Sequence, residues 1–174
     1  MRRLGVIVAL GALLGMVGGL ATASPALAGR GPKWEIVEIE PFTLPAEFCG
    51  FEVGVNVPVN KEYSKELKTP EGVVAATLTT GSLRASFTNL ETGKTITENI
   101  SGPLKTTVSP DGSAVVAFKG LTALFLEPAQ AKQFGLPIVS VTAGALTVSV
   151  DPNGIFTSVS LQGHVQVDIC AALS

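Results

Sequence analysis

The chain has 174 residues, of which 46% are hydrophobic and 15% are charged, with a formal net charge of −2, two Cys and one His. This apolar fraction is too high for an intrinsically disordered chain, and there is no excess of Lys and Arg for binding a nucleic-acid backbone. One His and two Cys are too few for a structural zinc site, which takes four ligands drawn largely from those residues. We therefore expect no metal site, no cofactor and no nucleic-acid partner.

The first 28 residues predict an export signal. A pair of arginines precedes the uncharged run from Leu4 to Leu20, and Ala26-Leu27-Ala28 forms a small-x-small cleavage site. The run reaches about the minimum length of a membrane span, but its Gly-rich composition and the cleavage site favour removal near Ala28. We expect a secreted product with no integral membrane anchor. The predicted organisation is a signal peptide at 1–28, an extended leader at 29–47 and a single β domain at 48–174.

Cys49 and Cys170 are the only cysteines and lie near the two ends of the mature chain. In an exported protein such a pair predicts a disulfide. The alternative, a free nucleophilic Cys, needs a nearby base and a reducing compartment. Closing so long a loop removes unfolded-state entropy worth about 4–5 kcal/mol in the chain-entropy model.

The mature sequence has the composition and the period of β-strands. Val, Ile and Thr account for 39 of the 146 residues from 29 to 174, and the apolar residues of Phe51–Val59 all have odd numbers. Pro58 predicts that this first strand ends there or lies at a sheet edge. Further strands are predicted within 74–78, 83–88, 96–100, 104–108, 115–118, 121–126, 146–150 and 155–162. One face is mostly aliphatic and the other rich in Thr and Ser, as in antiparallel strands with one wet side.

The connections between these runs carry turn residues. Ser109-Pro110-Asp111-Gly112 and Asp151-Pro152-Asn153-Gly154 share one pattern, and Asn89–Gly93 also ends in Gly. In this pattern Pro sets φ for the first turn residue, and Gly adopts the left-handed conformation that follows. Tight turns between consecutive strands predict an antiparallel meander of eight or nine strands.

Two segments interrupt the meander. Glu127–Gly135 has Pro at a first-turn position and Gly just past its end, which predicts a short helix near 128–134. Residues 60–71 are polar and charged, and we interpret them as a mobile loop in preference to a short helix that pairs Tyr63 with Leu67.

An all-β sheet of this size hides its apolar face by closing into a barrel or by folding into a sandwich. A disulfide requires Cα atoms within about 7 Å, so the start of the first strand and the end of the last must be neighbours. A closed up-and-down β-barrel provides that geometry, because its first and last strands pair. We predict this barrel, with a two-sheet sandwich as the alternative.

Several segments together resemble a group of secreted actinobacterial proteins that are usually labelled uncharacterised. The resemblance rests on Phe48-Cys49-Gly50-Phe51, Thr92-Gly93-Lys94, Asn99–Pro103, Pro110-Asp111-Gly112 and Asp168–Leu173 (DICAAL), and covers nearly the whole mature chain. These motifs are turns and cysteines, so the resemblance implies an exported protein of a Gram-positive bacterium and transfers no catalytic residue.

The candidates for chemistry each have a plain structural interpretation. His164 and Asp168 lie four residues apart on one predicted strand, about 13 Å at 3.3 Å per residue, too far for a catalytic relay. The acidic group Glu35, Glu38 and Glu40 lies in the leader, where a solvated arm or an edge strand is the commoner arrangement. Asp111 and Asp151 lack the alternating ligands of a calcium loop. Trp34 either caps the barrel or anchors a partner. We predict no catalytic residues.

The function that fits these observations is a non-enzymatic extracellular or cell-envelope protein, with an interaction or structural role and an envelope component as partner. An alternative is a barrel that holds a small apolar ligand, as barrels of about eight strands can. A further alternative is an isomerase or cyclase that works through the shape of its pocket. The candidate lining residues for a ligand are Phe87, Phe118, Leu146, Val148 and Leu161.

Overall fold

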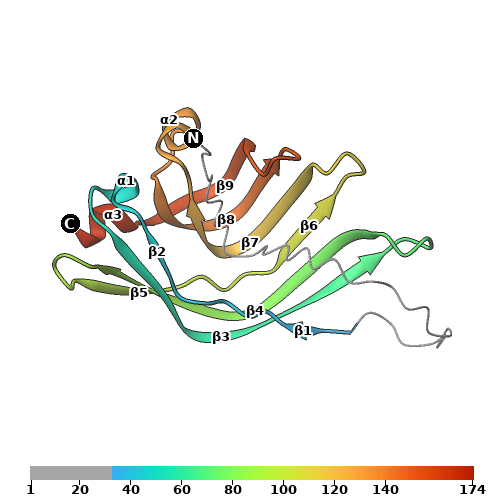
Figure 1. Ribbon diagram of the computed structural model, residues 1–174, viewed down its shortest axis with the longest axis horizontal. Coiled ribbons are helices and arrows are strands. Elements are labelled where there is room, and N and C mark those ends of the chain that lie inside the picture. Colours follow the sequence, from blue (N-terminus) through green and yellow to red (C-terminus); the bar gives the residue numbers. More distant parts are fainter. Residues whose placement is uncertain (1–32) are drawn as a thin grey trace, which may run out of the picture.

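The computed structural model describes residues 33–174, so the predicted export signal and its cleavage site lie outside the described residues. This part of the chain forms one antiparallel sheet with three short helices, which confirms the all-β prediction (Figure 1). The strands are β1 (Glu35–Ile36), β2 (Phe42–Leu44), β3 (Val53–Lys68), β4 (Val74–Asn89), β5 (Thr95–Asn99), β6 (Leu104–Val108), β7 (Ala114–Phe125), β8 (Val139–Val150) and β9 (Phe156–Asp168). The helices are α1 (Ala46–Cys49), α2 (Pro128–Phe134) and α3 (Ile169–Leu173).

The sheet is open. Its strands follow the order β1-β3-β4-β6-β7-β8-β9, with β2 also paired to β3 and β5 also paired to β4. Among the described residues no pairing joins β9 to the strands at the other end of this order, so the predicted barrel closure is not confirmed. All nine strands belong to one hydrogen-bonded sheet instead of the two sheets of a sandwich.

The prediction of a mobile loop at 60–71 is wrong, because β3 continues through this segment to Lys68. Lys61 lies opposite Ser82 and Lys65 opposite Leu78, so β4 supplies the backbone partners of this polar stretch. Only the turn that follows is a loop, closed by a hydrogen bond from the Gly72 amide to the Thr69 carbonyl. Pairing with a long neighbour outweighs the weak local strand pattern of this segment.

Pro58 does not end the first strand. The strand continues past it, and the register between β3 and β4 shifts between Asn56 and Val59. Such an irregularity accommodates a residue that cannot donate to the ladder. The predicted strands at 74–78 and 83–88 are likewise two halves of the single strand β4.

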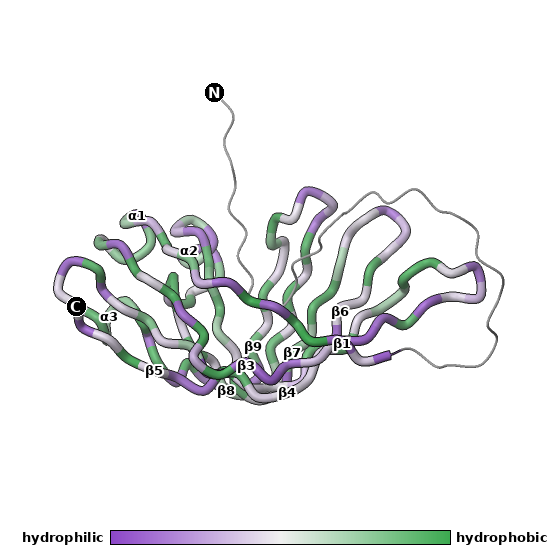
Figure 2. The backbone as a smooth tube through the Cα atoms, turned by 60° about the horizontal axis from the view of Figure 1, so that its bottom comes forward, coloured by the Kyte–Doolittle hydropathy of each residue, from purple (hydrophilic) through white to green (hydrophobic). Residues whose placement is uncertain are grey.

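Three glycines lie side by side across β7, β8 and β9. Gly120 is opposite Gly144, and Gly144 is opposite Gly163; we call these three the glycine row. Gly120 and Gly144 have φ of 92° and 122°, values that residues with a Cβ rarely adopt. Glycines inside strands mark bends and close backbone approach. Figure 2 shows a curved sheet, with α1, α2 and α3 over one half of the molecule and β6 in the other half.

The core consists of two clusters. The first cluster lies between the half of the sheet that holds β5 and the place where β7 ends and β8 begins. Its members include Phe48, Val53, Phe87, Phe125 and Ile169. The second cluster lies against the other side of β7 and β8. Its buried members are Leu104, Val116, Leu124, Leu126, Ala131, Leu146, Val148 and Phe156. Because β7 contributes Phe125 to one cluster and Leu124 to the other, both of its faces are covered at this end.

The predicted disulfide is confirmed. Cys49, the last residue of α1, is bonded to Cys170 of α3, with 5.1 Å between their Cα atoms. The two helices lie next to each other at the same end of the sheet (Figure 1). The cysteines therefore meet through two short helices and not through paired first and last strands, so the disulfide does not require a closed barrel.

The predicted helix at 128–134 is confirmed as α2, with Pro128 in its first turn and a capping box formed by Glu127 and Gln130. Ala131 packs into the second cluster and fastens α2 to the sheet. The two predicted Asp turns are also present, since Gly112 donates to Ser109 and Gly154 donates to Asp151 through the backbone. In the described part of the chain, no helix has both the length and the hydropathy of a membrane span.

Candidate functional site

The five residues predicted to line a ligand cavity do not surround one space. Phe87 is fully buried in the first cluster. The other four belong to the second cluster, with Leu146 and Val148 buried and Phe118 and Leu161 partly buried against them. These side chains fill the interior on two sides of the sheet, and of the five only Phe118 lines the hollow described next.

A small hollow lies where the two clusters meet, and we call it the Glu62 pocket. Its lining residues are Glu62, Leu83, Ile100, Gly102, Leu104, Phe118 and Thr122. Leu83 and Ile100 belong to the first cluster, whereas Leu104 and Phe118 pack in the second. The room inside is about 10 Å³, which is about the size of one water molecule.

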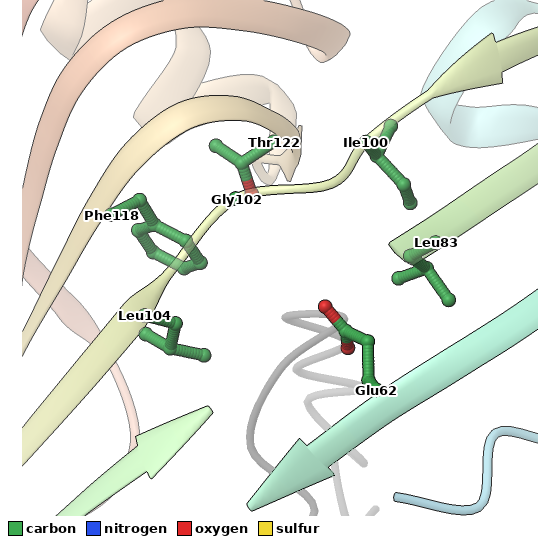
Figure 3. A pocket seen from close by; sticks show the side chains of 7 residues that line it. All are labelled: Glu62, Leu83, Ile100, Gly102, Leu104, Phe118 and Thr122. Atoms are coloured by element: carbon green, nitrogen blue, oxygen red, sulfur yellow. The ribbon is translucent and has the colours of Figure 1, made fainter. Parts of the chain in front are cut away.

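Glu62 is the acidic member of this pocket, and its carboxylate points into the space between the other side chains (Figure 3). Its exposed fraction is 5%. Within residues 33–174 the structure gives this carboxylate no hydrogen-bond or ion-pair partner, although the Glu62 amide donates to Asn60 Oδ1 at 3.1 Å. Burial raises the pKa of Glu62 above its ordinary value of 4.5, because desolvation disfavours the charged form.

Strand alternation explains why this residue faces inward. Glu62 shares a side of β3 with Ser64, and Ser64 lies opposite the buried Thr79 on β4. Tyr63, on the other side, is 43% exposed. Opposite Glu62 lies Gly81, where a Cβ would be only 2.6 Å from the Glu62 Cα. A glycine at this position therefore lets β3 and β4 approach closely behind the carboxylate.

The far wall of the pocket is a short connection between β5 and β6. A Cβ on Gly102 would lie 2.3 Å from the carbonyl oxygen of Lys119, so this connection runs directly against β7. Ser101 secures it, because its hydroxyl accepts from the Leu83 amide at 2.8 Å and lies 3.1 Å from the Leu83 carbonyl. The wall is thus held on two sides, by β4 and by β7.

A second hollow is a shallow surface groove of about 340 Å³ between β2, β3 and the turn after β4. Its lining residues are Pro41, Phe42, Thr43, Gly54, Val55, Asn56, Thr88 and Leu90. None of the five predicted lining residues contributes to it. The groove is wide open to solvent and contains no titratable side chain.

His164 and Asp168 are not brought together as a catalytic pair. His164 is exposed on β9 opposite Ala143. Asp168 caps α3 instead, because its Oδ1 accepts from the Ala171 amide at 3.1 Å. The helix cap at Asp168 was not predicted from the sequence.

The other sequence candidates also have structural positions. Glu35, Glu38 and Glu40 are all exposed, with Glu35 in the edge strand β1. Trp34 is 41% exposed, and Lys65 Nζ lies 4.7 Å from the centre of its ring. Among residues 33–174 no three His, Cys, Asp or Glu side chains are grouped as metal ligands.

The carboxylates of the two turn aspartates are occupied by their own turns. A hydrogen bond from the Ser113 hydroxyl to Asp111 lowers the pKa of Asp111, and the backbone amide of Ile155 does the same for Asp151. This pattern explains both residues as turn formers.

β9 forms an unpaired edge of the sheet. Its only strand partner in the described chain is β8. From Phe156 to Val167 the sequence contains no Lys, Arg, Asp, Glu or Pro. Long uncharged edges of this kind are unusual, because proteins commonly protect edge strands with charges, prolines or covering segments.

Sequence reasoning missed the Glu62 pocket because it placed this residue in a loop. The lengths on the two sides of the turn provide the signal that could have found it. The nine residues from Asn60 to Lys68 can pair, as the first strand of a hairpin, with strand-like residues that follow the turn. Within such a hairpin, alternation places Glu62 and Ser64 on one side. Comparisons of the chain with protein-family models, with curated proteins and with solved structures give no match.

Proposed function

We propose that the mature protein acts outside the cytoplasmic membrane as a non-enzymatic interaction protein, and that the free edge of β9 is its contact surface. The export signal, the actinobacterial resemblance and the disulfide between Cys49 and Cys170 support an extracellular site of action. The observation that carries the proposal is the unprotected edge of β9. The partner that we propose for this edge is β9 of a second copy of the chain.

The two edges of the sheet differ in how well they are protected against pairing with another strand, as an interface at β9 requires. At one end β3 carries Pro58 and three lysines, and β1 and β2 cover part of it. At the other end, no strand of the described chain pairs with the outer edge of β9, although α2 and α3 contact this strand, and β9 has no Lys, Arg, Asp or Glu before Asp168. Protection of one edge and not of the other favours strand addition at β9.

Strand alternation makes β9 complementary to itself. Val159, Leu161 and Val165 share its half-buried face, whereas Ser160 and Gln162 lie on the exposed face. When two copies pair antiparallel about a two-fold axis perpendicular to the sheet, each face continues into the same face of its partner. Apolar side chains then meet apolar ones, and no like charges face each other across the new pair.

The test is the oligomeric state of the purified mature protein, measured by light scattering coupled to size-exclusion chromatography over a range of concentrations. We expect a dimer, and we expect Ser160→Lys to weaken it by about tenfold or more, equal to about 1.4 kcal/mol, because the new charge lies at the interface. Thr147→Lys is the matched control, because Thr147 lies opposite Ser160 on the interior strand β8 and is also exposed. A monomeric wild type, or equal weakening by both variants, would overturn the proposal.

A further inference from the structure

Independently of the β9 edge, we propose that the Glu62 pocket is a binding site for a single primary alkylammonium group, the chemistry shared by free amines and lysine side chains. The juxtaposition that carries this inference is the carboxylate of a largely buried side chain, without a hydrogen-bond or ion-pair partner in the described chain, that reaches solvent through a hollow with room for one small group. No residue of the described chain supplies the missing positive charge.

The burial of Glu62 and the absence of a charged partner for its carboxylate favour a cation from outside the chain. A buried charge is costly unless it is paired, and the exposed fraction of Glu62 is 5%. Among the described residues, the one salt bridge joins Glu66 and Lys68 farther along β3. The aliphatic walls at Leu83, Ile100 and Leu104 offer nothing that could neutralise Glu62.

The size and shape of the pocket select the ligand. Its room of about 10 Å³ matches one water-sized group, and an ammonium head is of this size whereas a planar guanidinium is larger. An ammonium group donates three hydrogen bonds, and the two oxygens of Glu62 and the hydroxyl of Thr122 are acceptors on the lining.

The remaining lining of the hollow also suits an ammonium head. The Phe118 ring borders the same hollow, and aromatic rings attract ammonium groups at short range (Figure 3). The water-sized room holds the ammonium head alone, so an alkyl stem extends from it on the side that opens to solvent. A divalent metal ion fits less well, because calcium takes six to eight oxygen ligands and the pocket has a single carboxylate.

The test follows the carboxyl carbon of Glu62 by ¹³C NMR during a pH titration of the mature protein, with n-butylamine as the probe. We expect saturating n-butylamine to move the midpoint of the Glu62 titration to lower pH, because a bound cation stabilises the ionised form. Equal concentrations of n-butanol and of potassium chloride are the controls for the alkyl chain and for ionic strength. An unchanged midpoint with the amine, or the same shift with potassium chloride, would overturn the proposal.

Two variants locate the site. Glu62→Gln keeps the shape of the side chain and is expected to weaken amine binding at least about tenfold, since the charged partner is lost. The amide resonances of Ile100, Ser101, Gly102 and Leu104 follow the binding. Glu66→Gln is the matched control, because Glu66 lies on the same strand but is exposed. Equal affinities of wild type and Glu62→Gln would place the amine elsewhere and contradict the assignment.

The source of the ammonium group is addressed by a second probe. Nα-acetyl-lysine methylamide presents the same head on a peptide backbone, and n-butylamine presents it free. Tighter binding of the lysine derivative would support a peptide ligand, and tighter binding of n-butylamine would support a free amine. Failure of both probes to bind would overturn the ammonium site and would leave the dimer experiment on β9 unaffected.

Discussion

A single carboxylate, that of Glu62, has an environment unlike that of any other acid in the described chain. Its neighbours on β3 include lysines, yet these point to the other side of the strand and do not reach it. The lining of its pocket contains no other titratable group. The protonation of Glu62 is therefore governed by desolvation, which raises its pKa.

The raised pKa of Glu62 predicts a specific pH dependence of stability. Because the folded state holds this proton more tightly than the unfolded state, the contribution of Glu62 is fully present below its ordinary value of 4.5 and is lost as pH rises through the folded pKa. We expect Glu62→Gln to be more stable than wild type at pH 7 by about 1–2 kcal/mol, the scale of an unsatisfied buried polar group. The difference should vanish below pH 4.5 in urea unfolding experiments without added amine.

The control for this prediction is Glu66→Gln, which removes an exposed carboxylate of the same strand. Its free energy of unfolding should follow that of wild type within about 0.5 kcal/mol across the same pH range. A Glu62→Gln protein that is less stable than wild type at pH 7 would contradict the burial of an uncompensated charge.

At the scale of the element, a row of glycines crosses three of the long strands of this protein. β7, β8 and β9 each contain one member of the glycine row, and the two φ values above 90° in that row are compatible with glycine alone. In β8 and β9 the row lies between a part of the strand that packs in the first cluster and a part that packs in the second cluster. The glycine row therefore allows continuous strands to contribute to both clusters.

Gly163 provides the sharpest test of this role. A Cβ at this position would lie 1.9 Å from the carbonyl oxygen of Ala143, which is backbone of the neighbouring strand and cannot rotate away. We expect Gly163→Ala to lower the free energy of unfolding by about 2–3 kcal/mol, the upper range for forced backbone shifts. Chemical denaturation is the measurement. Gln162→Ala, a change at an exposed neighbour on the same strand, should cost less than about 0.5 kcal/mol. Equal stability of these two variants would show that β8 and β9 do not approach as closely as described.

At the scale of the whole molecule, helix α1 and the C-terminal helix α3 are joined at one end of an open sheet. The disulfide links α1 to α3, and the side chain of Asn89 donates to the carbonyl of Leu173 in the same region. Lys94 Nζ also lies 2.7 Å from the backbone oxygen of Ser174. An open sheet lacks the last strand pair of a barrel, and these contacts instead hold the C-terminal segment against α1 and the turn that follows β4.

The disulfide is expected to supply a large share of the stability. The two cysteines are 121 residues apart in sequence, and a bridge over so long a loop is worth about 4–5 kcal/mol in the chain-entropy model. The double variant Cys49→Ser, Cys170→Ser should lose this amount in urea unfolding. Reduced wild type should match the variant. A loss below about 1 kcal/mol would mean that the contacts of α1 and α3 hold the ends together without the bond.

The parts of the fold that could be predicted from the sequence depend on interactions between residues that are close together in the chain. The turns at Asp111 and Asp151, the helix at 128–134 and the alternation of most strands each arise from a few adjacent residues. The wrong prediction at 60–71 and the unconfirmed barrel closure depend on partners far along the chain. The Glu62 pocket belongs to the second group, because its lining comes from β3, β4, β6, β7 and the connection between β5 and β6.

The sequence by itself determined the strand content, the turn positions and the pairing of the only two cysteines, because turn residues and side-chain period act locally. Only the tertiary structure decided that residues 60–68 are a strand, that the sheet stays open and that Glu62 is buried. The physical reason is that strand pairing and desolvation depend on which distant segments approach one another. A polar segment such as 60–68 becomes a strand because β4 lies beside it, and its inward residue Glu62 is then largely buried.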